Sequence, residues 1–117
     1  MIHAADTHPL LVPKVRQHLT QDQGLNEEAL QKWLARALHS GLEAIEAQLS
    51  SSRDTGRYCH GDQVTQADIC LASHLLAFMF FKLDASAYPT AVAINERLQA
   101  LPAFAAAHPL KQPGAPA

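Results

Sequence analysis

The sequence has few cysteines, little net charge and no long apolar run. Its two cysteines, Cys59 and Cys70, do not form a CxxC motif, which predicts free thiols in a reducing compartment, although a single disulfide between them is also compatible with the sequence. A net charge of −2 gives no electrostatic basis for binding nucleic acid or an anionic membrane. No apolar run reaches the roughly 18 residues of a spanning helix, and the N-terminus lacks the basic and apolar segments of a signal peptide. We therefore expect a cytoplasmic protein with no nucleic-acid partner and no membrane partner.

Metal-binding and nucleophilic motifs are also missing. None of the seven histidines forms an HxH or an i, i+4 pair, and no cysteine stands at zinc-finger spacing, so we expect no metal site. Cys59 and His60 could suggest a nucleophile beside a base, but adjacent loop residues seldom face each other. We assign no catalytic residue and expect both to belong to a structural loop.

Strand signals are absent, whereas helix signals are frequent. The sequence has no period-two run of β-branched residues and no Asn-Gly or Asp-Gly turn. Apolar residues make up 48% and charged residues 17% of the chain, a balance typical of a globular domain. We predict one all-α domain over residues 1–117.

The clearest helix is a long amphipathic one over residues 26–50. Asn26 is a good N-cap, and two glutamates follow it at the positive end of the helix dipole. An apolar stripe then recurs at spacings of three and four: Leu30, Trp33, Leu34, Ala37, Leu38, Gly41, Leu42, Ile45 and Leu49. Trp33 is expected in the core, and Gly41 should mark a close helix crossing.

The remaining segments are shorter. A first helix should start at Pro13 and end near Gly24, with residues 8–12 irregular or bent because proline breaks the preceding turn. Residues 50–63 read as a loop. A further helix should carry Pro89 in its first turn and end at Pro102, before at most one short helix and a tail.

Asp68 is a carboxylate beside the apolar run ADICLASHLLAFMFF, where an unpaired charge would be costly. Thr65 precedes it by three residues, which is the capping-box spacing, and Val64 and Ile69 stand where a hydrophobic staple would lie. We therefore predict that Asp68 caps a helix that is apolar on nearly all sides and lies at the centre of the domain. His74 and Lys82 are expected at a partly exposed edge of that helix.

Three stretches in order, AADTHPL, GRYCHGDQVTQADICL and DASAYPTAVAINERLQALPAFAAAHP, resemble the helical C-terminal domain of glutathione transferases. The finer pattern resembles the zeta class, which includes maleylacetoacetate isomerase, and the resemblance runs from about Ala4 to Pro113. It implies a glutathione-transferase C-terminal-domain-like bundle of about five helices. The thioredoxin-like N-terminal domain, with its Ser-Ser-Cys motif, has no counterpart in these residues.

The resemblance implies glutathione-dependent cis–trans isomerisation of maleylacetoacetate in phenylalanine and tyrosine catabolism. It places His8 near glutathione, although His8 could instead be a polar residue of an N-terminal loop. Two positions depart from the family pattern. Leu11 and Val12 stand where the family has amides, and Phe80 stands where it has an arginine.

Two interpretations follow. In the first, the chain is the C-terminal domain of a glutathione S-transferase-like protein, inactive alone and possibly completed by a separate thioredoxin-like domain. In the second, it is a non-catalytic oligomerising or protein-interaction module on the same fold. In either case we expect a homo-oligomer, closed by two-fold symmetry, with Phe78, Phe80 or Phe81 near the contact.

Overall fold

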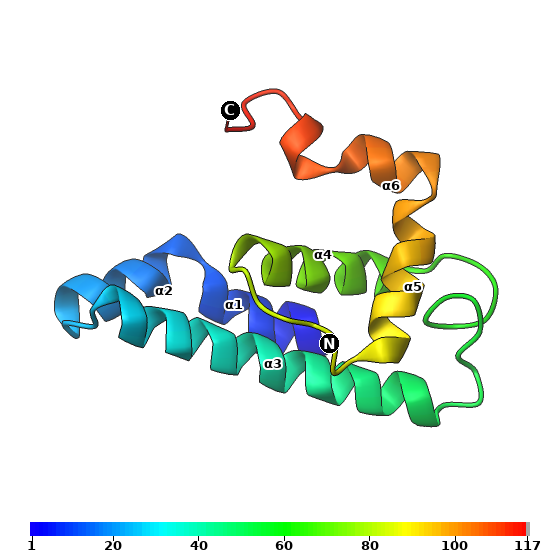
Figure 1. Ribbon diagram of the computed structural model, residues 1–117, viewed down its shortest axis with the longest axis horizontal. Coiled ribbons are helices and arrows are strands. Elements are labelled where there is room, and N and C mark those ends of the chain that lie inside the picture. The colour runs from blue at the N-terminus through cyan, green and yellow to red at the C-terminus, as the bar shows by residue number, and fades with distance from the viewer. Residues whose placement is uncertain (117) are drawn as a thin grey trace.

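The computed structural model describes residues 1–116, and the chain in this part consists of helices joined by turns and loops (Figure 1). No β-strand occurs in these residues, and the one isolated bridge joins Thr55 to Gly61 within a loop. The predicted all-α class is confirmed. In chain order the elements are η1 (Ile2–Thr7), α1 (His8–Leu11), α2 (Pro13–Gln17), η2 (His18–Asp22), α3 (Glu27–Ser51), α4 (Gln66–Phe80), α5 (Pro89–Gln99), α6 (Pro102–Ala107) and η3 (Pro109–Lys111).

The N-terminal segment is more regular than predicted. Two short helical segments, η1 and α1, precede Pro13, and α1 occupies most of residues 8–12, which the sequence suggested would be irregular or bent. Pro9 lies in the first turn of α1, where a missing N–H costs no helical hydrogen bond. The break falls at Val12, which is extended (φ −65°, ψ 148°) because the next proline disfavours a helical conformation there. The predicted start at Pro13 is confirmed, and Gly24, at φ 70°, follows the end of the arm formed by η1, α1, α2 and η2.

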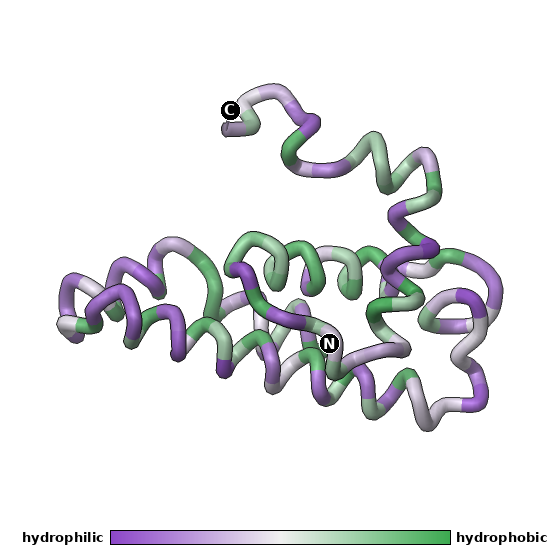
Figure 2. Tube along the Cα trace, in the orientation of Figure 1, coloured by the Kyte–Doolittle hydropathy of each residue, from purple (hydrophilic) through white to green (hydrophobic). Residues whose placement is uncertain are grey.

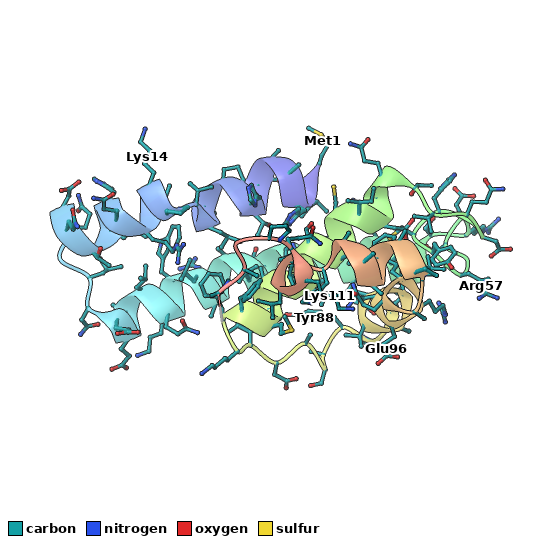
Figure 3. The ribbon with its side chains drawn as sticks, turned by 90° about the horizontal axis from the view of Figure 1, so that it is seen from above. Met1, Lys14, Arg57, Tyr88, Glu96 and Lys111 are labelled. Carbon is teal, nitrogen blue, oxygen red and sulfur yellow. The ribbon has the colours of Figure 1, made fainter. Side chains whose placement is uncertain are left out.

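Helix α3 begins as predicted. The Asn26 side chain accepts a hydrogen bond from the N–H of Ala29 at 2.8 Å, which satisfies one of the free donors of the first turn. Its apolar stripe faces the core, and Trp33 is half-buried at the edge of that core. The N-terminal arm runs antiparallel beside α3, as Figures 1 and 3 both show.

The core lies where α3, α4 and α5 meet. Helix α5 has Pro89 as its first residue, as predicted, and buries Ile94 and Leu98. Glu46 of α3 supplies its cap, because the carboxylate accepts from the N–H groups of Thr90 at 2.9 Å and Ala91 at 2.8 Å. Desolvation opposes the Glu46 charge, but these donors outweigh it and lower the pKa of the carboxyl.

Helix α4 is apolar along its length (Figure 2), but it is not buried on all sides. Leu71, Leu75 and Phe78 point into the core, whereas Met79 and Phe80 are each 50% exposed. The predicted central place of α4 holds for one face only, because α3 and α5 pack against part of the helix and a hollow lies between another part of it and α6. None of the helices described is both long and apolar enough to cross a membrane.

Candidate functional site

Asp68 is fully buried, and its carboxylate joins the start of α4 to the preceding loop. Thr65 and Asp68 form the predicted capping box, with each side chain at the other residue's backbone N–H. The hydrogen bond to the Asp68 carboxylate is the stronger of the two in this box. The N–H of Asp68, which the Thr65 side chain faces, is shared with the carbonyl oxygen of Thr65 at 3.1 Å. Oδ2 accepts from Thr65 N at 2.8 Å and from Thr65 Oγ1 at 3.1 Å.

The other carboxylate oxygen makes a contact that the sequence did not predict. Oδ1 of Asp68 accepts from the N–H of Cys59 at 2.9 Å, across the loop. The charge is therefore satisfied by three donors and needs no cationic partner. Val64 and Ile69, the predicted staple, are 40% and 55% exposed, so a contact between them would bury little apolar surface.

Cys59 is not an activated nucleophile. Burial raises the pKa of its thiol to about 12, and the neighbouring Asp68 carboxylate adds to the effect. A pKa this high keeps the thiol protonated at neutral pH. Because only the thiolate reacts readily, the Cys59 side chain is unreactive. Its neighbour His60 is exposed on the loop. Cys59 and Cys70 are both free thiols in the structure.

His74 lies in the interior, contrary to the partly exposed edge predicted for it. It is fully buried on α4, and its Nε2 is 2.9 Å from the carbonyl oxygen of Leu38 on α3. A ring nitrogen beside a carbonyl must donate, so we assign the proton of His74 to Nε2. Lys82, the other residue predicted at that edge, is exposed and adopts φ 55°.

Gly41 is what lets His74 and η1 approach α3. A Cβ at Gly41 would collide with the Thr7 hydroxyl and would lie 2.8 Å from Cε1 of His74. The predicted close crossing at Gly41 is confirmed. It brings the buried Thr7 of η1 and His74 of α4 to the same point on α3.

A hollow of about 550 Å³ lies between the N-terminal arm and α4. His8, the predicted glutathione contact, stands at its wall as the exposed first residue of α1, with its ring 5.6 Å from that of His3. The pKa of His3 is lowered to about 4 by burial and, to a lesser degree, by the nearby His74 and His8. The residues that line the hollow are His3, His8, Leu11, Arg16, Ser73, Leu76, Ala77, Phe80 and Phe81.

Arg16 is a residue of this hollow that sequence reasoning missed, because a lone arginine on a short helix carries no motif. Its guanidinium carbon lies 5.8 Å from the centre of the Phe81 ring. Phe80, at the position where the resemblance implies an arginine, lines the same hollow from α4.

Phe78, predicted near the contact between copies, and Leu11, at a position where the resemblance implies an amide, both belong to the core. Phe78 is only 2% exposed and packs edge-on against His39, with ring centres 4.9 Å apart. Leu11 is also buried, so it adds nothing to an exposed patch. Among residues 1–116, no three His, Cys, Asp or Glu side chains gather in a way that could hold a metal ion.

Three comparisons place this chain among known proteins. It is 42% identical over 101 residues to maleylacetoacetate isomerase of Rattus norvegicus, which covers 86% of this chain and 46% of the relative. The structure superimposes with a TM-score of 0.95 and 47% identity on maleylacetoacetate isomerase of Methylobacterium extorquens AM1, with bound malonate and GSH, over 99% of this chain and 54% of that one. A maleylpyruvate isomerase, a bacterial glutathione S-transferase of the zeta class, gives a TM-score of 0.94 at 30% identity, over 98% of this chain and 54% of that one.

The chain spans about half the length of the curated relatives it matches. Its homology to maleylacetoacetate isomerases covers 86% of this chain for the Rattus norvegicus relative and 99% for the Methylobacterium extorquens structure. Residues 23–108 match the profile of the glutathione S-transferase C-terminal domain. By that match, the chain belongs to the glutathione S-transferase C-terminal domain family.

Proposed function

We propose that the chain is the C-terminal half of a glutathione-dependent isomerase of the maleylacetoacetate isomerase type. In this reaction glutathione adds transiently to a cis double bond and leaves after rotation to the trans form. The observation that supports the proposal is the match along 99% of the chain, at a TM-score of 0.95, to an isomerase that holds GSH and malonate. The two free thiols are consistent with a cytoplasmic setting.

In this proposal a thioredoxin-like domain supplies most of the glutathione site and the catalytic groups. The share of this chain is to form one wall of the site, with His8 of α1 at the hollow beside α4. The protonated thiol of Cys59 takes no part, and the reaction as proposed needs no metal. The chain alone should therefore show no turnover.

An isomerase assay tests this division of roles. The 117-residue chain would be assayed alone and as a fusion behind the thioredoxin-like half of the Methylobacterium extorquens relative. We expect no glutathione-dependent isomerisation of maleylacetoacetate by the chain alone and measurable isomerisation by the fusion. A folded fusion that binds glutathione but does not isomerise would overturn the proposal, and so would turnover by the chain alone in a mass-verified sample.

Calorimetry tests the role of His8 separately. Because one imidazole supplies few contacts, glutathione binding by the chain alone should be on the order of millimolar or weaker. His8→Ala in the active fusion should weaken glutathione binding, whereas His60→Ala, which changes an exposed histidine that does not line this hollow, should not. Equal effects of the two variants would remove His8 from the site.

We also propose that the chain alone, with no thioredoxin-like domain covering this face, associates with a second copy of itself through a two-fold contact near Phe80. Met79 and Phe80 are half-exposed on α4, and Ile69 is exposed further along the same helix. Large apolar side chains exposed together on one helix are typical of association surfaces. Phe78 is not part of this surface because it is buried in the core.

A second candidate function is a non-catalytic interaction module on the same fold. It is supported by Phe80 in place of the arginine that the resemblance implies, and by Leu11 and Val12 in place of amides. In that case the fusion would fold without isomerising, while self-association of the chain would persist. The assay and a measurement of oligomeric state together separate the two functions.

A further inference from the structure

Two histidines from distant parts of the sequence meet between the N-terminal arm and α4. His3 lies on η1 and His74 lies on α4, and their Nδ1 atoms are 3.2 Å apart although 71 positions separate the two residues. No short-range spacing of histidines indicates this pair, because only the fold creates it. The pair has no part in the isomerase reaction proposed above.

The ring of His74 is held in the way that is usual for a metal ligand. Its Nε2 donates to the carbonyl oxygen of Leu38 at 2.9 Å, so the lone pair of its Nδ1 is directed towards His3. Histidine ligands in proteins almost always donate their second ring N–H to a carbonyl or a carboxylate, which fixes the tautomer and the ring orientation. His74 is also fully buried, so packing limits its rotation.

The separation of the two nitrogens fits two ligands of one tetrahedral ion. Nitrogens bound to zinc at about 2.0–2.1 Å lie about 3.3–3.4 Å apart when they subtend a tetrahedral angle, and the Nδ1 atoms of His3 and His74 are 3.2 Å apart. The ring centres are only 5.1 Å apart with the planes inclined at 58°, whereas rings aligned end to end would have their centres further apart. A hydrogen bond prefers a straight approach, but two ligands of one ion approach it at an angle.

His3 borders open space on two sides, which leaves room for further ligands of an ion. It lines the hollow of about 550 Å³ between the N-terminal arm and α4, and also a second hollow of about 680 Å³ beside the C-terminal part of α3. Water from either hollow can complete a coordination shell, as it does in open zinc sites. Two histidines and water bind an ion more weakly than a closed site of four side chains, so exchange of the ion with solvent is expected.

We propose that His3 and His74 form an open binding site for a divalent transition-metal ion, for which Zn²⁺ has the best-fitting geometry. Each histidine binds the ion through Nδ1, and water molecules occupy the remaining positions. The pKa of His3 is about 4, so neither ring has to lose a proton at pH 7. The proton that lies between the two nitrogens in the metal-free chain moves to Nε2 of His3. A bound ion would tie η1 to α4 close to the crossing at Gly41.

The test uses the 117-residue chain at pH 7 with Co²⁺, Zn²⁺ and Mg²⁺ as separate probes. Tetrahedral Co²⁺ absorbs visible light more strongly than the octahedral ion in water, so we expect saturable bands of the tetrahedral type, which excess Zn²⁺ removes by competition. In ¹⁵N spectra of the histidine rings, Zn²⁺ should shift the signals that are lost in His3→Gln and in His74→Gln. Mg²⁺, which prefers oxygen ligands, should leave them in place. Bands of the octahedral type alone, or shifts confined to other histidines, would overturn the proposal.

His18→Gln is the matched control, because His18 lies 2.7 Å from Asp22 on the surface, where an ion could bind adventitiously. His3→Gln and His74→Gln should each weaken Zn²⁺ binding about tenfold or more, since the loss of even an outer-shell partner costs about 10–100-fold. His18→Gln should change the affinity less than twofold. Equal losses in the three variants would show adventitious surface binding and contradict the site.

His8→Gln separates the proposed pair from a surface pair. The ring of His8 is exposed and its centre lies 5.6 Å from that of His3, so its loss should also change the Zn²⁺ affinity less than twofold. A loss as large as that in His74→Gln would place the ion between His3 and His8 instead. If His74→Gln is unfolded by circular dichroism, His3→Gln at the partly exposed position decides alone, and full Zn²⁺ affinity in that variant would rule the site out.

Discussion

His3 of η1 and His74 of α4 face each other through their Nδ1 atoms, which are 3.2 Å apart. Because His74 donates through Nε2 to the carbonyl of Leu38, its Nδ1 must accept, and His3 Nδ1 must carry the proton between them. His74 is therefore neutral in the assigned network, and a pKa of about 4 leaves His3 neutral at pH 7 as well. Burial is the first cause of a lowered pKa in each, and for His74 it outweighs the opposing bond to Leu38.

This pair predicts a loss of stability in mild acid. The pKa of His3 is about 4 in the folded chain, against an ordinary value of 6.5, so the unfolded chain binds a proton first as pH falls. Stability is fully present above pH 6.5 and is lost as pH falls towards 4. His3 is partly exposed, so with solvent screening we expect a loss on the order of 1–2 kcal/mol. Urea unfolding at several pH values between 7 and 4 measures it.

His3→Gln provides the control for this pH dependence. Glutamine can donate to Nδ1 of His74 but does not titrate, so its unfolding free energy should fall less steeply over the same interval. His60→Gln, on the exposed loop, should retain the wild-type slope. Identical slopes in wild type and His3→Gln would show that the pair does not set the acid sensitivity.

Asp68→Ala should destabilise the fold without removing any reactive group. It takes away the cap of α4 and the acceptor for the N–H of Cys59, a loss of roughly 1–3 kcal/mol. Thr65→Ala should cost less, and the double variant should cost less than the sum because the two residues share one box. Denaturation midpoints measure all three, and unchanged midpoints in both single variants would rule out a stabilising box.

Gly41→Ala should be among the most damaging small substitutions on α3. An added methyl group would collide with Thr7 and press on His74, and overpacking of this kind costs roughly 1–3 kcal/mol. Ser40→Ala, one residue earlier and exposed, should be neutral or slightly stabilising because alanine favours the helix. Adding Thr7→Ala to Gly41→Ala should restore part of the loss. Thermal unfolding of these three variants and the wild type tests this, and equal melting temperatures of Gly41→Ala and wild type would contradict the close crossing.

Residue patterns within one helical turn predicted the starts of the helices well. The Asn26 cap, the Pro89 start and the Thr65–Asp68 box each depend on residues within one turn of each other. Contacts between distant segments had no such signal. Examples are the cap of α5 by Glu46 and the bond from Cys59 to Asp68.

The candidate site was harder to predict for the same reason. Helix α4 is apolar on most sides, so periodicity could not show that His74 faces inwards and Phe80 outwards. Arg16 entered no motif, and only the fold brings it to the hollow beside α4. The family resemblance placed His8 near glutathione, but it could not indicate a cation at position 16.

Phe80→Arg tests the proposed self-association. The wild-type chain should form a dimer at high micromolar concentration. Burying the half-exposed side chains of Met79 and Phe80 in a contact would stabilise the dimer by about 25 cal/mol per Å² of apolar surface. A charge at position 80 would be desolvated in the contact, so the variant should dissociate. Lys82→Gln, an exposed neighbour, should remain dimeric and controls for a change of charge alone. Light scattering across a concentration series decides: a monomeric wild type, or a dimer that Phe80→Arg leaves intact, would show that α4 does not form the contact.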